Sequence, residues 1–186
     1  SKKGKHIITT AVEHHAILHT CEALEKEGYT VTYLPVDEFG KVDPAAVEAA
    51  ITPETILLSV MYANNEIGTI MPIREIGAIA RKHGVLFHTD AVQAAGHIPI
   101  DVKADNIDLL TLTAHKFHGP KGTGAVYIKQ GVKIGRLVYG GGQEKGLRAG
   151  TENTAGILGL GLAAVHAKEN MKENSERITR LRDKLI

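Results

Sequence analysis

The sequence has little cysteine, no tryptophan and few aromatic residues of any kind. A single cysteine, Cys21, stands among 186 residues, which excludes an internal disulfide and favours a reducing compartment, the cytoplasm. The 22 Lys and Arg residues nearly balance 21 Asp and Glu, so the basic excess expected of a nucleic-acid partner is absent. The apolar runs are only as long as strands, and none could cross a membrane as a helix.

Short apolar or β-branched segments alternate with segments of helical periodicity along the chain. Strands are predicted at residues 6–10, 30–35, 55–63, 85–90, 108–113 and 124–129. Helices are predicted at 14–27, 44–51, 72–83 and 155–168, followed by a charged amphipathic segment at 173–186. This alternation predicts one α/β domain, with a mostly parallel sheet flanked by helices and right-handed crossovers.

Two of the predicted strands end in polar groups that could hold pyridoxal phosphate. The run LLTLTAHK at 109–116 brings His115 and Lys116 after one strand, and VLFHTDAVQ at 85–93 brings Asp90 and Gln93 after another. A lysine amine can form a Schiff base with the cofactor aldehyde, and an aspartate can keep the pyridine nitrogen protonated. Because ligands of open α/β sheets sit at the carboxyl ends of strands, we predict such a site here. Taken singly, Lys116 would be a surface charge and Asp90 a helix N-cap.

Three further features are candidates for the same site. His14, at the start of the first helix, could lie flat on an aromatic cofactor and exchange a proton, or be a solvated surface group. Asn64 and Asn65 follow a buried strand and could reach a ligand, or could mark only a turn. The glycine-rich loop at 140–150 could bind phosphate through backbone N–H groups, or could be a flexible surface loop.

Other kinds of site are not supported. The chain has ten histidines, but those at 14–15 and 115–118 lack the spacing of a zinc-binding helix, and no cysteine cluster accompanies them. We therefore predict no metal centre. Neither the dinucleotide fingerprint nor the Walker phosphate-binding pattern is present. Cys21 lies in an apolar helical stripe with Ile17 and Leu24, which predicts core packing rather than a nucleophile.

With these residues the sequence resembles the pyridoxal-phosphate-dependent cysteine desulfurases of the NifS/IscS type, fold-type I enzymes of the class V aminotransferase group. The resemblance covers nearly the whole chain. The motifs that carry it are EHHA at 13–16, NNEIG at 64–68, HTDAVQ at 88–93, AHK at 114–116, GPKG at 119–122 and RAGT at 148–151. The NNEIG form is similar to the NifS/IscS branch rather than to the SufS or selenocysteine lyase branch.

The resemblance implies catalytic roles for three residues. Lys116 would carry the cofactor as a Schiff base. Asp90 would pair with the pyridinium nitrogen, and His14 would stack on the ring and help to move protons.

It also implies the remaining cofactor contacts. Gln93 would bind the ring hydroxyl, and Asn65 would contact that hydroxyl or the substrate carboxylate. Thr113 and His115 would bind the phosphate, together with Thr151 of the partner subunit in a homodimer.

The activity so implied converts L-cysteine to L-alanine and passes persulfide sulfur to an acceptor protein or scaffold for iron–sulfur cluster assembly, or to tRNA thiolation. Members of the family are longer, so we expect residues 1–186 to be an incomplete pyridoxal-phosphate-binding large domain. The N-terminal segment and the C-terminal small domain with its catalytic-cysteine loop would lie elsewhere, and the isolated chain would be inactive. Two alternatives stay open: a non-catalytic cofactor-domain fragment that serves as a binding or dimerisation module, and another class V enzyme such as a selenocysteine lyase or an aminotransferase.

Overall fold

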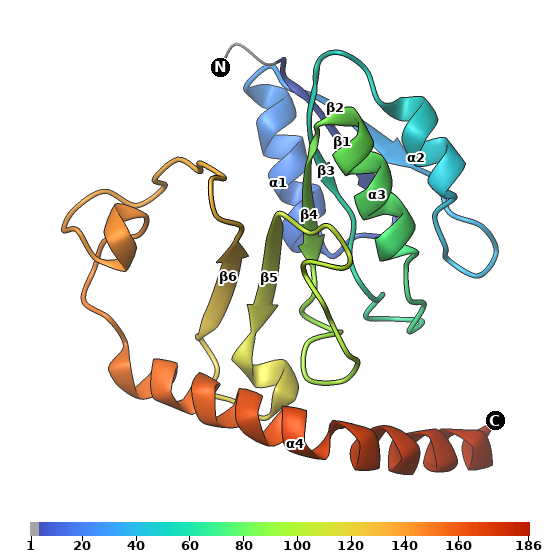
Figure 1. The fold of residues 1–186 in the computed structure, drawn as a ribbon, viewed down its shortest axis with the longest axis vertical. Helices are drawn as coiled ribbons and strands as arrows, with labels where there is room; N and C mark the ends of the chain where they lie inside the picture. Colours follow the sequence, from blue (N-terminus) through green and yellow to red (C-terminus); the bar gives the residue numbers. More distant parts are fainter. Residues whose placement is uncertain (1–3) are drawn as a thin grey trace.

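The computed structural model describes residues 4–186, which form one six-stranded sheet in the order β2-β1-β3-β4-β5-β6 (Figure 1). The first five strands run parallel, and β6 runs antiparallel to β5. The strands are β1 His6–Thr10, β2 Thr30–Leu34, β3 Thr55–Ser59, β4 Leu86–Asp90, β5 Leu109–Thr113 and β6 Gly124–Ile128. The predicted α/β class with a mostly parallel sheet is confirmed.

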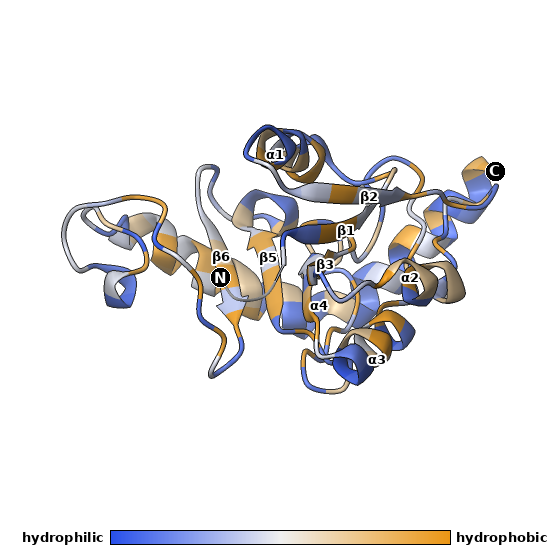
Figure 2. Cartoon of the chain, turned by 90° about the horizontal axis from the view of Figure 1, so that it is seen from above, coloured by the Kyte–Doolittle hydropathy of each residue, from blue (hydrophilic) through white to orange (hydrophobic). Residues whose placement is uncertain are grey.

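Helices cover both faces of this sheet. The helices are α1 His15–Lys26, α2 Pro44–Ala50, α3 Ile73–His83 and α4 Thr154–Leu185, with short 3₁₀ turns η1 Ala114–Phe117 and η2 Glu144–Gly146. Seen along the sheet in Figure 2, α1 lies on one face, and α2 and α3 lie on the other. The first three crossovers between parallel strands each carry a helix over a face of the sheet, whereas β4 and β5 are joined by residues 91–108 without a helix.

The face under α2 and α3 holds the main hydrophobic core. Ile8, Leu58 and Phe87 are fully buried and lie side by side in register across β1, β3 and β4. Val47 of α2 and Ile76 of α3 belong to the same buried cluster. Burying each such side chain contributes about 1.5–3 kcal/mol, so this face supplies much of the stability that holds the strand ends in place.

The opposite face of the central strands is polar. The Ser59 hydroxyl lies 2.8 Å from Nδ1 of His88, and Nε2 of His88 lies 3.2 Å from the Thr111 hydroxyl. Burial lowers the pKa of His88, so its ring is neutral at physiological pH. Alternate residues of a strand face the same side, which puts Asp90 on this polar face, one step closer to the carboxyl end of β4.

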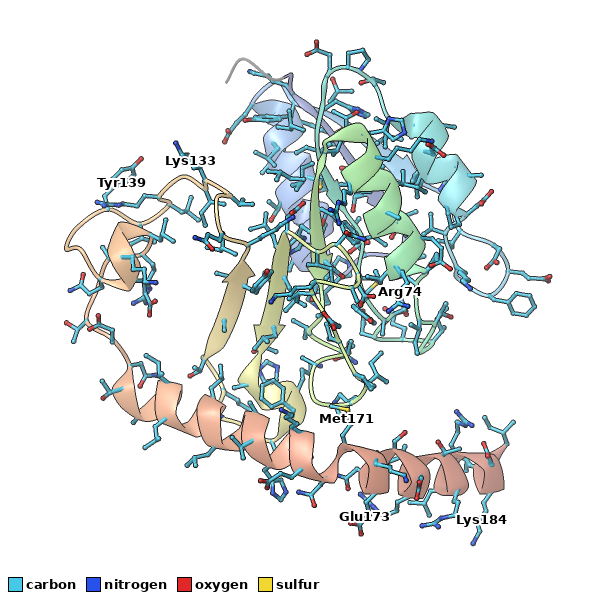
Figure 3. All side chains as sticks on the ribbon, viewed as in Figure 1. Arg74, Lys133, Tyr139, Met171, Glu173 and Lys184 are labelled. Carbon is cyan, nitrogen blue, oxygen red and sulfur yellow. The ribbon has the colours of Figure 1, made fainter. Side chains whose placement is uncertain are left out.

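The C-terminal helix differs from the prediction. We expected a helix ending near residue 168 and a separate segment at 173–186, but α4 is one continuous helix of 32 residues. The sequence between them, ENMK at 169–172, contains no Gly or Pro that would end a helix. Figure 3 shows the side chains of Glu173 and Lys184 projecting away from the sheet, and nearly all of this half is exposed.

Small residues let the first half of α4 approach the sheet closely. A Cβ added at Gly159 would lie 3.1 Å from the ring of Pro120. Further along the helix, Ala167 is buried against Ala95 and Phe117. Because Phe117 belongs to η1, α4 supports the turn that carries Lys116.

The remaining differences concern element ends. The strand predicted at 55–63 ends at Ser59, although the chain beyond it still pairs with β4, since the Tyr62 N–H donates to the Asp90 carbonyl at 2.8 Å. The helix predicted at 14–27 begins at His15, and His14 is its N-cap. In the described part of the chain, no helix combines the length and the apolar character that crossing a membrane requires.

Candidate active site

Polar side chains from several segments meet at the carboxyl end of the parallel strands and line one cavity of about 330 Å³. All the predicted site residues except Thr151 line it: His14, Asn65, Asp90, Gln93, Thr113, His115 and Lys116. Met61, Ala63 and Val92 add apolar surface to its wall. The cavity thus offers apolar contact together with one amine, one carboxylate, two imidazoles, two amides and a hydroxyl.

Asp90 reaches the cavity from the last position of β4. It is buried, and its Oδ1 accepts a hydrogen bond of 2.9 Å from the Val92 N–H. Oδ2 has no hydrogen-bond partner within residues 4–186. The cap interpretation and the ligand interpretation are therefore compatible, because one oxygen holds the turn and the other is left for a ligand. Gln93 follows on this turn and lines the same cavity.

Lys116 is held on a rigid turn. Directly after β5, η1 buries Ala114 and Phe117 and leaves Lys116 exposed at the cavity. The carbonyl oxygen of Lys116 accepts a hydrogen bond of 2.9 Å from Nε2 of His97, which fixes the protonated nitrogen of that ring. The backbone of Lys116 is thus fixed on one side by packing and on the other by an imidazole, while its amine stays free.

Thr113 and His115 form a polar pair beside the lysine. The Thr113 hydroxyl donates to the Thr123 carbonyl at 3.2 Å and lies 3.1 Å from Nδ1 of His115. Because the single hydroxyl hydrogen points at Thr123, Nδ1 of His115 is the donor in the second bond. The Nε2 atom of His115 is then the acceptor in the neutral ring and a donor in the charged one.

His14 is an unusual N-cap. Its Nδ1 accepts a hydrogen bond of 3.2 Å from the Ala16 N–H, so Nδ1 carries no proton. In the neutral ring the proton is therefore on Nε2. The cap fixes the orientation of the ring at the edge of the cavity, and the side chain remains exposed to a ligand.

Asn64 and Asn65 have different surroundings, although they are neighbours in the sequence. Asn64 is buried, and its Oδ1 accepts from the N–H groups of Glu66 and Ile67 while its Nδ2 donates to the Val12 carbonyl. Its side chain holds the turn and is not available to a ligand. Only Asn65 lines the cavity, so the prediction that both could reach a ligand was wrong for Asn64.

The glycine-rich loop and Thr151 lie away from this cavity. The loop at 140–150 is mostly exposed, and Tyr139 beside it is 81% exposed and projects outward in Figure 3. In Figure 1 the segment lies beyond β6, on the side away from β4. Thr151 is exposed and does not line the cavity. Within one protomer the structure does not bring the loop at 140–150 or Thr151 to the other predicted cofactor-binding residues.

Two buried titratable groups near the ends of the central strands were not predicted as site residues. Glu13 is buried, and its Oε1 accepts from the Thr10 hydroxyl at 2.8 Å and from the Met61 N–H at 2.9 Å. Burial raises the pKa of Glu13 to about 7, and the negative charge of Asp90 adds to the rise. His88 is the second. The sequence signal for Glu13 was its place between a β-branched strand and a helix cap.

Cys21 is buried on α1, as predicted. Burial raises the pKa of its thiol, and the nearby carboxyls of Glu13 and Glu25 raise it further. A thiol in this setting is a poor nucleophile. Among the described residues, no group of three or more His, Cys, Asp or Glu side chains could hold a metal ion.

The family described as aminotransferase class-V matches residues 1–186. The chain belongs to the class-V aminotransferase family. It is 65% identical over 185 residues to the cysteine desulfurase IscS of Clostridium botulinum (strain Hall), covering 100% of this chain and 47% of that protein.

Solved structures agree with this membership. A NifS-like protein superposes with a TM-score of 0.96 and 44% identity, covering 100% of this chain and 51% of the other. A structure described as SspA in complex with cysteine gives a TM-score of 0.86 and 46% identity, over 89% of this chain and 48% of the other. The chain spans about half the length of the curated relatives it matches.

Proposed function

We propose that residues 1–186 are the pyridoxal-phosphate-binding part of a cysteine desulfurase. The observation that carries the proposal is the cavity of about 330 Å³ that Lys116 and Asp90 line from the ends of neighbouring strands. This volume is in the range of ligand cavities, roughly 300–1,000 Å³. The apolar wall and the unpartnered Asp90 oxygen fit a flat, protonated aromatic ring.

The cofactor, when bound, supplies an electron-withdrawing ring that stabilises negative charge at the Cα of an amino acid. Lys116 would hold it through its amine, because η1 leaves that amine free at the cavity. Asp90 would face the ring nitrogen with the oxygen that Val92 does not use, and would keep that nitrogen protonated. Gln93, one turn further, would bind the ring hydroxyl.

His14 and Asn65 would act on the exposed side of the site. With Nδ1 occupied by the Ala16 N–H, His14 has only Nε2 for giving and taking a proton. The helix cap holds the ring in one orientation, which suits stacking on a flat ligand. Asn65 would contact the ring hydroxyl or the substrate carboxylate.

The phosphate would bind at the turn after β5. The Thr113 hydroxyl and the His115 ring are already joined there, and Nε2 of a charged His115 can donate to an anion. The partner subunit's Thr151 would complete the phosphate site in a homodimer. Thr151 is exposed in this protomer and lies away from its own cavity, which is compatible with a contact to the phosphate bound in a second copy.

The substrate would be L-cysteine, supported by the identity of 65% to a cysteine desulfurase IscS. In the reaction the substrate C–S bond breaks, the sulfur joins an enzyme thiolate as a persulfide, and alanine leaves. Cys21 is buried on α1, so the accepting thiol would belong to a part of the protein outside residues 1–186. These residues alone would then not turn over, and they would form an incomplete large domain. The persulfide would serve iron–sulfur cluster assembly or tRNA thiolation in the cytoplasm through an acceptor protein.

The test is Lys116→Ala in the full-length protein, with Lys103→Ala as a matched control, since Lys103 is exposed and does not line the cavity. We expect wild type and Lys103→Ala to bind pyridoxal phosphate with a visible absorption band and to form a borohydride-reducible adduct. Lys116→Ala should show neither the covalent adduct nor desulfurase activity. An adduct formed at equal yield in Lys116→Ala would overturn the proposal.

A further inference from the structure

Glu13 lies directly behind the wall of the cavity. It comes between β1 and the N-cap of α1, and its Oε1 receives the Thr10 hydroxyl and the Met61 N–H. Met61 and His14, its neighbour in sequence, both line the cavity. One carboxyl oxygen therefore joins the end of β1, the chain beyond β3 and the start of α1.

The second oxygen of this carboxyl is buried without a partner. Oε2 of Glu13 has no hydrogen bond in the described part of the chain, and none of the ion pairs among residues 4–186 includes Glu13. An ionised carboxylate can accept about four hydrogen bonds, whereas this one accepts two, both on the same oxygen. A buried charge so poorly compensated is costly, and a buried acid in this position takes up a proton instead.

None of the titratable groups that face Glu13 supplies a positive charge that would offset the negative charge of an ionised Glu13. From β4 it meets the carboxylate of Asp90, and from α1 the thiol of Cys21. His14 follows it in the chain with its Nδ1 used as an acceptor. The segment beyond β3 contributes only the backbone N–H of Met61.

We propose that Glu13 is a positioning residue of the cofactor pocket and acts as a neutral carboxylic acid, so that of the two buried carboxyls Glu13 and Asp90 only Asp90 carries a negative charge. The part of this inference that concerns the cofactor rests on the proposed function. Two ionised carboxyls side by side would each disfavour the other's charge, and Asp90 must be ionised to face a protonated ring. Burial and the Asp90 charge also raise the pKa of Glu13 to about 7, in agreement with the geometry.

The first measurement needs no cofactor. Infrared difference spectra of the cofactor-free full-length protein should show a protonated carboxylic acid at pH 6 in wild type that is absent from Glu13→Gln. The band should fade as the pH rises through about 7. Glu22→Gln is the control, because Glu22 is an exposed glutamate on the same helix, and it should keep the band. A spectrum of Glu13→Gln identical to wild type at pH 6 would overturn the neutral acid.

The second measurement tests positioning. Gln keeps an uncharged acceptor where Met61 and Thr10 donate, whereas Ala removes it. Hydrogen exchange at the Met61 amide should therefore accelerate in cofactor-free Glu13→Ala and stay near wild type in Glu13→Gln. Affinity for pyridoxal phosphate should fall about tenfold or more in Glu13→Ala and much less in Glu13→Gln. Equal exchange rates at the Met61 amide in all three proteins would overturn the positioning role of Glu13. A wild-type protein that fails to bind pyridoxal phosphate would overturn only the proposed function.

Discussion

Oδ1 of Asp90 accepts the Val92 N–H at 2.9 Å, so the same carboxylate that faces the cavity also closes the turn after β4. This relationship separates two properties of the residue. An amide oxygen can keep the turn, but an amide cannot carry the negative charge that a protonated ring nitrogen requires.

Under the proposed function we therefore expect Asp90→Asn to fold normally and to retain much of the bound pyridoxal phosphate while losing turnover. Removing one preorganised electrostatic partner typically costs a hundredfold or more, so kcat should fall by at least about a hundredfold. The measurement is steady-state desulfurase activity of the full-length protein beside its cofactor absorbance. Near-normal kcat would remove Asp90 from the reaction.

His88 should make the fold sensitive to acid. Burial lowers the pKa of its ring below the ordinary value of 6.5, so the unfolded chain binds the proton more readily than the folded one. Stability from this residue is present above pH 6.5 and is lost as the pH falls below it. Between pH 7.5 and pH 5 the free energy of unfolding measured in urea should fall more for wild type than for His88→Gln.

His19→Gln is the control for this experiment, because His19 is an exposed histidine on α1. It should keep the slope of wild type. Glu13 is expected to have the opposite effect, because its raised pKa makes stability fall as the pH rises from 4.5 to about 7. The contribution of His88 is therefore measured as the difference between wild type and His88→Gln, since both proteins contain Glu13. A His88→Gln curve parallel to wild type would show that the ring titrates as in the unfolded chain.

Two helical glycines should respond to alanine with opposite signs. A Cβ on Gly77 of α3 would collide with the backbone carbonyl of Asp105, whereas one on Gly161 of α4 would meet nothing within 4 Å. Gly77→Ala should destabilise the fold by about 1–3 kcal/mol or more, since overpacking against backbone forces the helix to move. Gly161→Ala should stabilise it by roughly 0.5–1 kcal/mol. Thermal unfolding of the two variants checks both signs.

Cys21 should be dispensable for sulfur transfer. Its thiol is buried on α1 and its pKa is raised by burial, so it cannot act as a mobile thiolate. Cys21→Ser in the full-length protein should keep its sulfide release and lose about 1–3 kcal/mol of stability, because a hydroxyl replaces a small apolar group in the interior. Sulfide release that vanishes in a folded Cys21→Ser protein would make Cys21 the sulfur acceptor.

The sequence predicted the sheet and most of the cavity for a simple physical reason. Short apolar or β-branched runs are conspicuous in a sequence, and in a parallel sheet the carboxyl ends of the strands lie at one edge, so polar residues such as Asp90 and Lys116 had to come close. The spacing of residues along the chain was sufficient for this inference.

What the sequence could not give depended on contacts between distant segments. Asn64 and Asn65 are identical in type, and only the position of the Val12 carbonyl decides that Asn64 is consumed by the turn. The burial of Glu13 depends on the chain beyond β3, 48 positions away. The continuity of α4 was missed although residues 169–172 contain no Gly or Pro that would end a helix.

The strand order β2-β1-β3-β4-β5-β6 also determines the order in which strands can join the sheet during synthesis. β3 adds to the free edge of β1, and each of β4, β5 and β6 then adds to the edge that its immediate predecessor has just exposed. A nascent chain ending before Leu109 already contains the strands that place His14, Asn65 and Asp90, and it still lacks η1. The residues that line the cavity are therefore synthesised in chain order, and Lys116 is the last of them.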